Sequence, residues 1–151
     1  MTTKTILLVE DNPDDVELTI RALRKNRVAN RVVIVRDGAE AVDWLFGTGT
    51  HAGRDVSDQP AVILMDIKMP KIDGLEVLAK IRADPRTRRN PVVMLTSSKQ
   101  QEDVLRAYDN GANSYIRKPV DFDRFTEAIR QIGLYWMVLN ELPVPDAGAD
   151  A

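Results

Sequence analysis

The chain has 151 residues, of which 44% are hydrophobic and 29% are charged, and its formal net charge is -2. These values fit one globular domain with a single core, and they give no electrostatic case for binding nucleic acid or an anionic membrane. The absence of cysteine excludes disulfides and thiolate metal sites. Because we find no signal peptide, membrane-spanning run or internal repeat, we expect a soluble cytoplasmic protein.

The first predicted strand, residues 5–9, is a short apolar run that ends in two carboxylates, Glu10 and Asp11. Asn12 follows as a helix cap and Pro13 suits the first helical position, so a helix is expected directly afterwards. Because Asn12 already caps this helix, Glu10 and Asp11 are left without a local role. A capping or helix-dipole role is the simpler alternative for both acids.

A second buried strand is predicted over residues 32–35, followed by a short helix over 39–46. A polar loop of unusual length then spans residues 47–60 and contains His51, the only histidine. With no second potential ligand nearby in sequence, His51 is expected to be a surface residue.

The third apolar run, residues 61–65, is typical of a strand buried on both faces of a parallel sheet. Asp66 follows it directly and therefore emerges at the carboxyl edge, where open α/β sheets bind their ligands. A turn leads from Asp66 to a helix expected over residues 74–82. The simpler alternative is that Asp66 only ends the strand and caps this turn.

The rest of the pattern adds strands over 91–95 and 114–117, with a helix between Ser98 and Asn110. A final helix is expected from Phe122 to about Leu142. Residues 1–142 then form one domain, and 143–151 form a disordered tail. Five strands that alternate with five helices indicate an α/β fold with a doubly wound, flavodoxin-like parallel sheet, and we adopt the strand order 2-1-3-4-5 by analogy.

Four strand ends of this sheet carry polar side chains to one edge. They are Glu10 and Asp11, Asp66, Thr96, and Lys118. Three clustered carboxylates repel one another unless a hard divalent cation lies among them, and oxygen ligands suit Mg²⁺. A lysine opposite the acids and a nearby hydroxyl complete a phosphate site, so the set predicts a carboxylate that accepts a phosphoryl group.

Over residues 4–132 the chain resembles the receiver domain of two-component response regulators. The resemblance lies in Glu10-Asp11, in Asp66 with Met69-Pro70 and Asp73-Gly74, in Thr96-Ser97 and in Lys118-Pro119. The 47–60 loop and residues 135–143 are similar to those of stand-alone regulators that pair with cyanobacterial and bacterial phytochrome kinases. This resemblance implies a phosphoacceptor signalling protein rather than a turnover enzyme, without a DNA-binding domain. Its implied partner is a sensor histidine kinase of the phytochrome type.

The resemblance also gives each site residue a role, with Asp66 as the phosphoacceptor. The implied Mg²⁺ ligands are Asp11, Asp66, the backbone carbonyl of Lys68, and Glu10 through a bound water. The implied phosphoryl-binding and switch residues are Thr96, Ser97, Tyr115 and Lys118. The Lys118–Pro119 peptide is expected to be cis. As an alternative, Tyr115 is simply a half-exposed strand aromatic.

Two other classes of protein stay open at this point. A haloacid-dehalogenase-like phosphatase also forms an aspartyl phosphate, but it usually has a second acid two residues after the nucleophile, where this chain has Lys68. A pseudo-receiver, which acts only as an interaction module, is the other alternative, and the complete set of site residues argues against it.

The final predicted helix favours a homodimer. One of its faces is enough to dock it on the domain; that face comprises Phe122, Phe125, Ile129, Ile132, Trp136 and Leu139. Further apolar residues are left over, among them Leu134, Tyr135, Val138 and Leu142. A second copy of the chain could bury them, and a two-fold pair is the commonest arrangement. The alternative is that they cover a flank of their own domain.

Overall fold

The fold is described from a computed structural model of the chain. The structure describes residues 5–26, 30–67, 69–96, 108–109, 111–117 and 122–134. All statements on structure below concern these residues.

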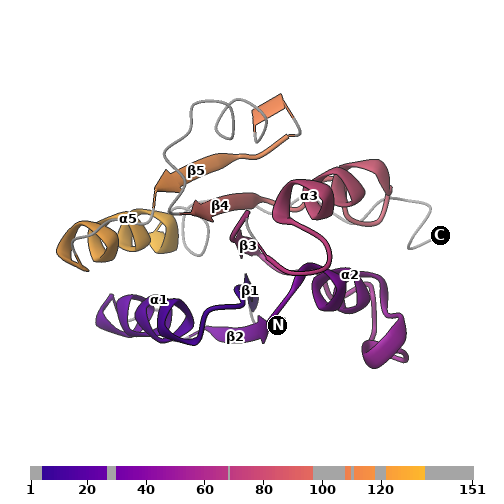
Figure 1. Cartoon of the computed structure of the whole chain (residues 1–151), viewed down its shortest axis with the longest axis horizontal. Coiled ribbons are helices and arrows are strands. Elements are labelled where there is room, and N and C mark those ends of the chain that lie inside the picture. The colour runs from indigo at the N-terminus through magenta and orange to yellow at the C-terminus, as the bar shows by residue number, and fades with distance from the viewer. Residues whose placement is uncertain are drawn as a thin grey trace.

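A parallel sheet with the strand order β2-β1-β3-β4-β5 forms the centre of the molecule (Figure 1). Its strands are β1 (Thr5–Val9), β2 (Arg31–Val35), β3 (Val62–Met65), β4 (Val92–Thr96) and β5 (Ser114–Arg117). The described helices are α1 (Pro13–Lys25), α2 (Gly38–Phe46), the short 3₁₀ helix η1 (Gly49–His51), α3 (Gly74–Ala83) and α5 (Phe122–Leu134). The predicted flavodoxin-like sheet is therefore confirmed. Most of the helix expected between Ser98 and Asn110 lies outside the described residues.

Helices cover both faces of the sheet, with α1 and α5 on one face and α2 and α3 on the other (Figure 1). Alternate side chains of each inner strand fill two separate cores, as the period of two in a strand requires. In β1, Leu7 packs in the core beside α2 and α3, whereas Leu8 packs in the core beside α1 and α5. Every residue of β1 and β3 is buried, which is why both strands have nearly uninterrupted apolar sequences.

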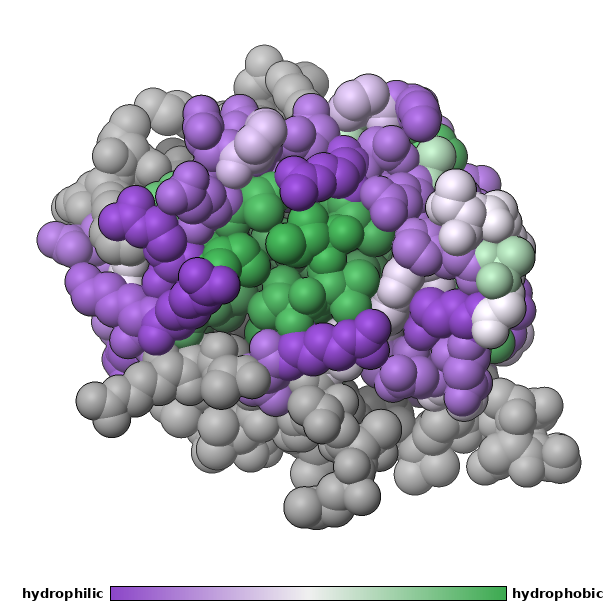
Figure 2. Space-filling view, turned by 90° about the horizontal axis from the view of Figure 1, so that it is seen from below, coloured by the Kyte–Doolittle hydropathy of each residue, from purple (hydrophilic) through white to green (hydrophobic). Residues whose placement is uncertain are grey.

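The edge strand β2 is less completely covered than the inner strands. Its residues Val32, Val33 and Ile34 are only half-buried. Figure 2 views the molecule from the side on which β2 lies in Figure 1, and it shows an apolar area ringed by hydrophilic side chains.

Side-chain caps mark the starts of α1 and α2. Asn12 accepts hydrogen bonds from the backbone N–H groups of Asp14 and Asp15, at 2.9 and 3.3 Å, so its predicted role as the cap of α1 is confirmed. Asp37 caps α2 in the same way by accepting from the N–H of Glu40 at 2.7 Å. None of the helices within the described ranges has the length and apolar character of a membrane span.

The 47–60 loop folds back onto α2. The guanidinium of Arg54 lies 3.7 Å from the centre of the Trp44 ring and donates to the carbonyl oxygen of Asp58 at 2.8 Å. Nε2 of His51 lies 3.1 Å from a carboxylate oxygen of Glu40, and the His51 side chain is only 28% exposed. His51 is therefore partly covered and paired with Glu40, a contact that the sequence did not predict, because η1 turns this residue back onto α2.

Candidate metal centre at the carboxyl edge of the sheet

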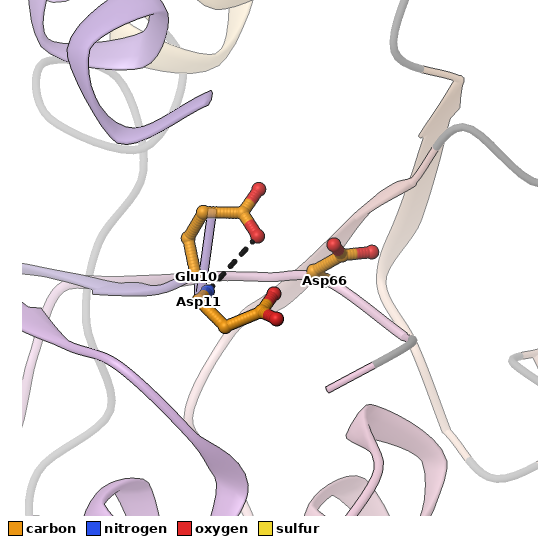
Figure 3. A group of neighbouring side chains, drawn as sticks. All are labelled: Glu10, Asp11 and Asp66. Carbon is orange, nitrogen blue, oxygen red and sulfur yellow. Dashed lines mark hydrogen bonds between the residues drawn. The ribbon is translucent and has the colours of Figure 1, made fainter. Parts of the chain in front are cut away.

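The carboxylates of Glu10, Asp11 and Asp66 meet where β1 and β3 end. Each contributes one oxygen atom to a group whose members all lie within 4.8 Å of one another (Figure 3). The two strands are neighbours and pair Val9 with Met65, so the residues that follow them emerge side by side. The hydrogen bonding between β1 and β3 extends to Asp66, since its backbone N–H donates to the carbonyl of Val9 at 3.1 Å.

The three acids differ in how far they are buried. Glu10 is only 2% exposed, and one of its carboxylate oxygens accepts a hydrogen bond from the N–H of Asp11 at 3.1 Å. Asp66 is half-buried and Asp11 is exposed. The cluster is therefore anchored in the protein at Glu10 and open to solvent at Asp11.

This donor set fits a hard divalent cation. All three groups offer carboxylate oxygen, the ligand type that Mg²⁺ and Mn²⁺ prefer. A cation among them would also relieve the repulsion between neighbouring negative charges. The exposed side of the cluster leaves room for the waters that Mg²⁺ usually retains.

The segment after Asp66 is held tightly at its far end. The N–H of Gly74 donates to the carbonyl of Ile67 at 2.7 Å, and the side chain of Asp73 caps α3 by accepting from the N–H of Glu76 at 2.9 Å. A Cβ atom on Gly74 would lie 2.1 Å from the carbonyl oxygen of Asp66. Only glycine allows this approach, so the loop can pack against the backbone of Asp66 only because residue 74 is glycine.

Several predicted site residues lie outside the described part of the chain. They are Lys68, Ser97, Lys118 and Pro119 and the predicted dimer residues Tyr135, Val138 and Leu142, together with the side chains of Thr96, Tyr115 and Leu134. The backbone places Thr96 at the end of β4, the strand beside β3, and pairs Tyr115 of β5 with Met94. The roles of these residues, and the cis peptide at Pro119, stay predictions.

The sequence predicted no part in the site for Asp37 and Gly38. In the structure α2 begins at Gly38, one residue before the predicted start, and the turn at Asp37 and Gly38 contacts the loop that follows Asp66, through Lys71 and Ile72.

Comparison with known proteins agrees with this geometry. A family model described as the response regulator receiver domain matches residues 6–130. The probable methanogenesis regulatory protein FilR2 of Methanothrix harundinacea is 40% identical over 140 residues, which cover 93% of this chain and 88% of FilR2. Response regulator Rcp1 of Synechocystis sp. is 35% identical over 140 residues and 93% of both chains.

Solved structures of two relatives match nearly the whole chain. The structure of the phosphorylated cyanobacterial phytochrome response regulator RcpA has a TM-score of 0.85 at 39% identity, with 94% of this chain and 99% of RcpA covered. The Mn²⁺-bound form of Rcp1 has a TM-score of 0.83 at 34% identity, with 93% and 99% covered.

Proposed function

The chain belongs to the response regulator receiver domain family, and we propose that it is a single-domain response regulator phosphorylated on Asp66 by a sensor histidine kinase. The observation that carries this proposal is the meeting of Glu10, Asp11 and Asp66 at the carboxyl edge of the sheet. Relatives that cover nearly the whole chain support it, since one is described as phosphorylated and another as Mn²⁺-bound.

In the proposed reaction a carboxylate oxygen of Asp66 attacks the phosphorus of a kinase phosphohistidine. The new O–P bond forms as the N–P bond breaks, and the imidazole leaves with the electron pair of that bond. Asp11 and Asp66 would hold Mg²⁺ together with the carbonyl of Lys68, while the buried Glu10 would act through a water. Bound Mg²⁺ supplies charge neutralisation for the incoming phosphoryl group. The phosphoryl group stays on the protein, so no outside substrate is turned over.

Phosphorylation would convert the Asp66 carboxylate into an acyl phosphate whose phosphoryl group carries about two negative charges. We assign Lys118 to bind the phosphoryl oxygens, with Thr96 and Ser97 as hydroxyl donors to them. Movement of Thr96 toward the phosphoryl group would let the Tyr115 ring turn inward. The active conformer would gain stability only through these differential contacts, and the output surface would lie around the helix expected between Ser98 and Asn110, β5 and α5.

The proposal is tested with acetyl phosphate as a small-molecule donor. With Mg²⁺ present, intact mass spectrometry should find one phosphoryl group on the wild type and none on Asp66→Asn, which preserves the shape of the side chain. Asp73→Asn, which replaces the cap of α3 with another good cap, is the matched control and should be phosphorylated like the wild type. Equal labelling of Asp66→Asn would overturn the assignment.

We also propose a phytochrome-type kinase as the partner. The support is the likeness of this chain to RcpA, which is described as a phytochrome response regulator. Purified phytochrome kinases should transfer phosphate to this chain much faster than kinases with unrelated sensor domains do. Equal rates from both groups would contradict this partner.

A homodimer built on the last helix completes the proposal. The surplus apolar residues of the sequence, Leu134, Tyr135, Val138 and Leu142, would form its surface. Sedimentation velocity should show a dimer for the wild type and a monomer for the double variant Tyr135→Glu, Val138→Glu. A wild type that stays monomeric at micromolar concentrations, with and without phosphorylation, would exclude the dimer.

A further inference from the structure

The loop between Asp66 and Gly74 rests on the turn that joins β2 to α2. Nζ of Lys71 lies 3.4 Å from a carboxylate oxygen of Asp37. The carbonyl oxygen of Ile72 lies 2.0 Å from the position that a Cβ atom on Gly38 would occupy. Real Cβ atoms never approach an oxygen so closely, so the loop can sit here only because residue 38 is glycine.

Asp37 contacts both elements at once. One carboxylate oxygen accepts from the N–H of Glu40 and caps α2, while the other faces Lys71. The Asp37 side chain is 20% exposed. Its pKa lies below the usual value, chiefly because of the hydrogen bond from Glu40 and further because of Lys71. The carboxylate is thus ionised and fixed in place beside the loop.

Lys71 itself has an unfavourable backbone conformation. Its φ of 69° is left-handed, and no other non-glycine residue in the described ranges has a positive φ. Such a conformation persists only where surrounding contacts impose it. The contacts with Asp37 and Gly38 lie directly at this point of the loop.

We propose that Asp37, Gly38 and Lys71 are positioning residues for the phosphorylation site, which act by holding the 66–74 loop in the geometry that aims Asp66. This inference rests on the proposed function. The loop carries Asp66 at one end, and Gly74 fixes its other end against the Asp66 carbonyl. In this proposal a displacement at Ile72, between these points, is transmitted along the loop and moves the carboxylate relative to Glu10 and Asp11.

The first test is Gly38→Ala. Alanine favours the helix, but its methyl group must push the Ile72 carbonyl away. We expect Mg²⁺ affinity, measured by isothermal titration calorimetry, to fall by about fivefold or more, the effect of a loop shifted by a few tenths of an ångström at a metal ligand. Gly53→Ala is the matched control. It strains a backbone with φ of +91° but meets no atom within 4 Å, so it should keep wild-type Mg²⁺ affinity even if it lowers the melting temperature.

The second test separates charge from backbone shape. Lys71→Asn tolerates the left-handed conformation but removes the ammonium group, and Asp37→Asn keeps a capping oxygen but removes the charge. Each should weaken Mg²⁺ binding by about twofold to threefold, as expected for a partly exposed ion pair. The double variant Asp37→Asn, Lys71→Asn should bind Mg²⁺ no more weakly than either single variant does. Lys71→Arg, which keeps the positive charge, should bind Mg²⁺ like the wild type.

Hydrogen exchange in EDTA tests the same inference without metal. The N–H of Gly74, bonded to the Ile67 carbonyl, should exchange faster in Gly38→Ala and Lys71→Asn than in the wild type and Gly53→Ala. Unchanged exchange and unchanged Mg²⁺ affinity in Gly38→Ala and Lys71→Asn would overturn the inference. If wild-type protein neither binds Mg²⁺ nor accepts phosphate, the proposed function fails, and the exchange result alone decides whether the turn holds the loop.

Discussion

Two polar clusters lie at opposite edges of the sheet, and they differ in the charges of the groups that they bring together. At the carboxyl edge three carboxylates from β1 and β3 lie together. At the amino edge, where β4 and β5 begin, the single guanidinium of Arg82 is surrounded by oxygen atoms. The first cluster concentrates like charges, whereas the second satisfies one charge with neutral acceptors.

The Arg82 cluster is complete within the protein. Its guanidinium donates five hydrogen bonds of 2.7–3.0 Å, which end on the carbonyls of Gly111, Arg88 and Asn90 and on the side chain of Asn113. These bonds tie the end of α3 to the segments that precede β4 and β5. Burial lowers the pKa of Arg82 from its usual value. Such a cluster stabilises the fold and needs no ligand.

The carboxylate cluster has a different character, because it places three like charges close together, and a bound cation would offset their repulsion. A protein keeps such an arrangement where binding requires it. The Arg82 cluster thus holds the structure together, whereas the carboxylate cluster has the composition of a cation site. Four predictions test this difference.

The largest effect is expected from Arg82→Ala. It leaves several partly buried carbonyls without their donor, so the free energy of unfolding in urea should fall by about 2–4 kcal/mol. The control Arg86→Ala removes an exposed pair with Asp84 and should cost less than about 1 kcal/mol. Equal losses of stability in the two variants would show that Arg82 contributes no more to the free energy of unfolding than an exposed arginine does.

Metal should stabilise the protein only through the carboxylate cluster. At a Mg²⁺ concentration of about 100 times Kd, the free energy of unfolding should rise by about 2.7 kcal/mol. Asp11→Ala should lose most of this gain, while Asp14→Ala, in the exposed first turn of α1, should retain it. The same gain in both variants would argue that Asp11 is only a first-turn acid.

Asp66→Asn should not destabilise the metal-free protein. Removing one of three neighbouring charges relieves repulsion, so thermal unfolding in EDTA should show unchanged stability or a gain of up to about 1 kcal/mol. Asp14→Asn, which removes an exposed charge outside the cluster, should give no such gain. A clear loss in Asp66→Asn would mean that this carboxylate supports the fold.

The smallest effect concerns Asp37, a carboxylate that is completed by partners as Arg82 is. Its pKa in the folded protein lies below the ordinary value of 3.8, so its ionic contribution is present above that pH and is lost as the pH falls through the folded value. The stability difference between wild type and Asp37→Asn should stay below about 1 kcal/mol near neutrality and shrink below about pH 4. A difference that grows in acid would contradict this sign.

Signals that act within a few residues were readable from the sequence. The Asn12 cap depends on the next three positions, and the buried strands depend on apolar runs of four or five residues. The meeting of Glu10, Asp11 and Asp66 was also predictable, because parallel strands end at a common edge. The contact between His51 and Glu40 was not predicted, because the two residues belong to different elements.

The strands, the helix starts and the acids at the carboxyl edge were thus predictable from the sequence, since period, capping and strand direction are local or follow from chain order. The approach of Gly38 to Ile72 and the hydrogen bond of Arg82 to Gly111 became visible in the folded structure alone. These contacts join residues some 30 positions apart, and their geometry depends on how α2, α3 and the strands pack. No pattern along the chain encodes a distance between two packed elements, so such contacts appear only once the elements are assembled.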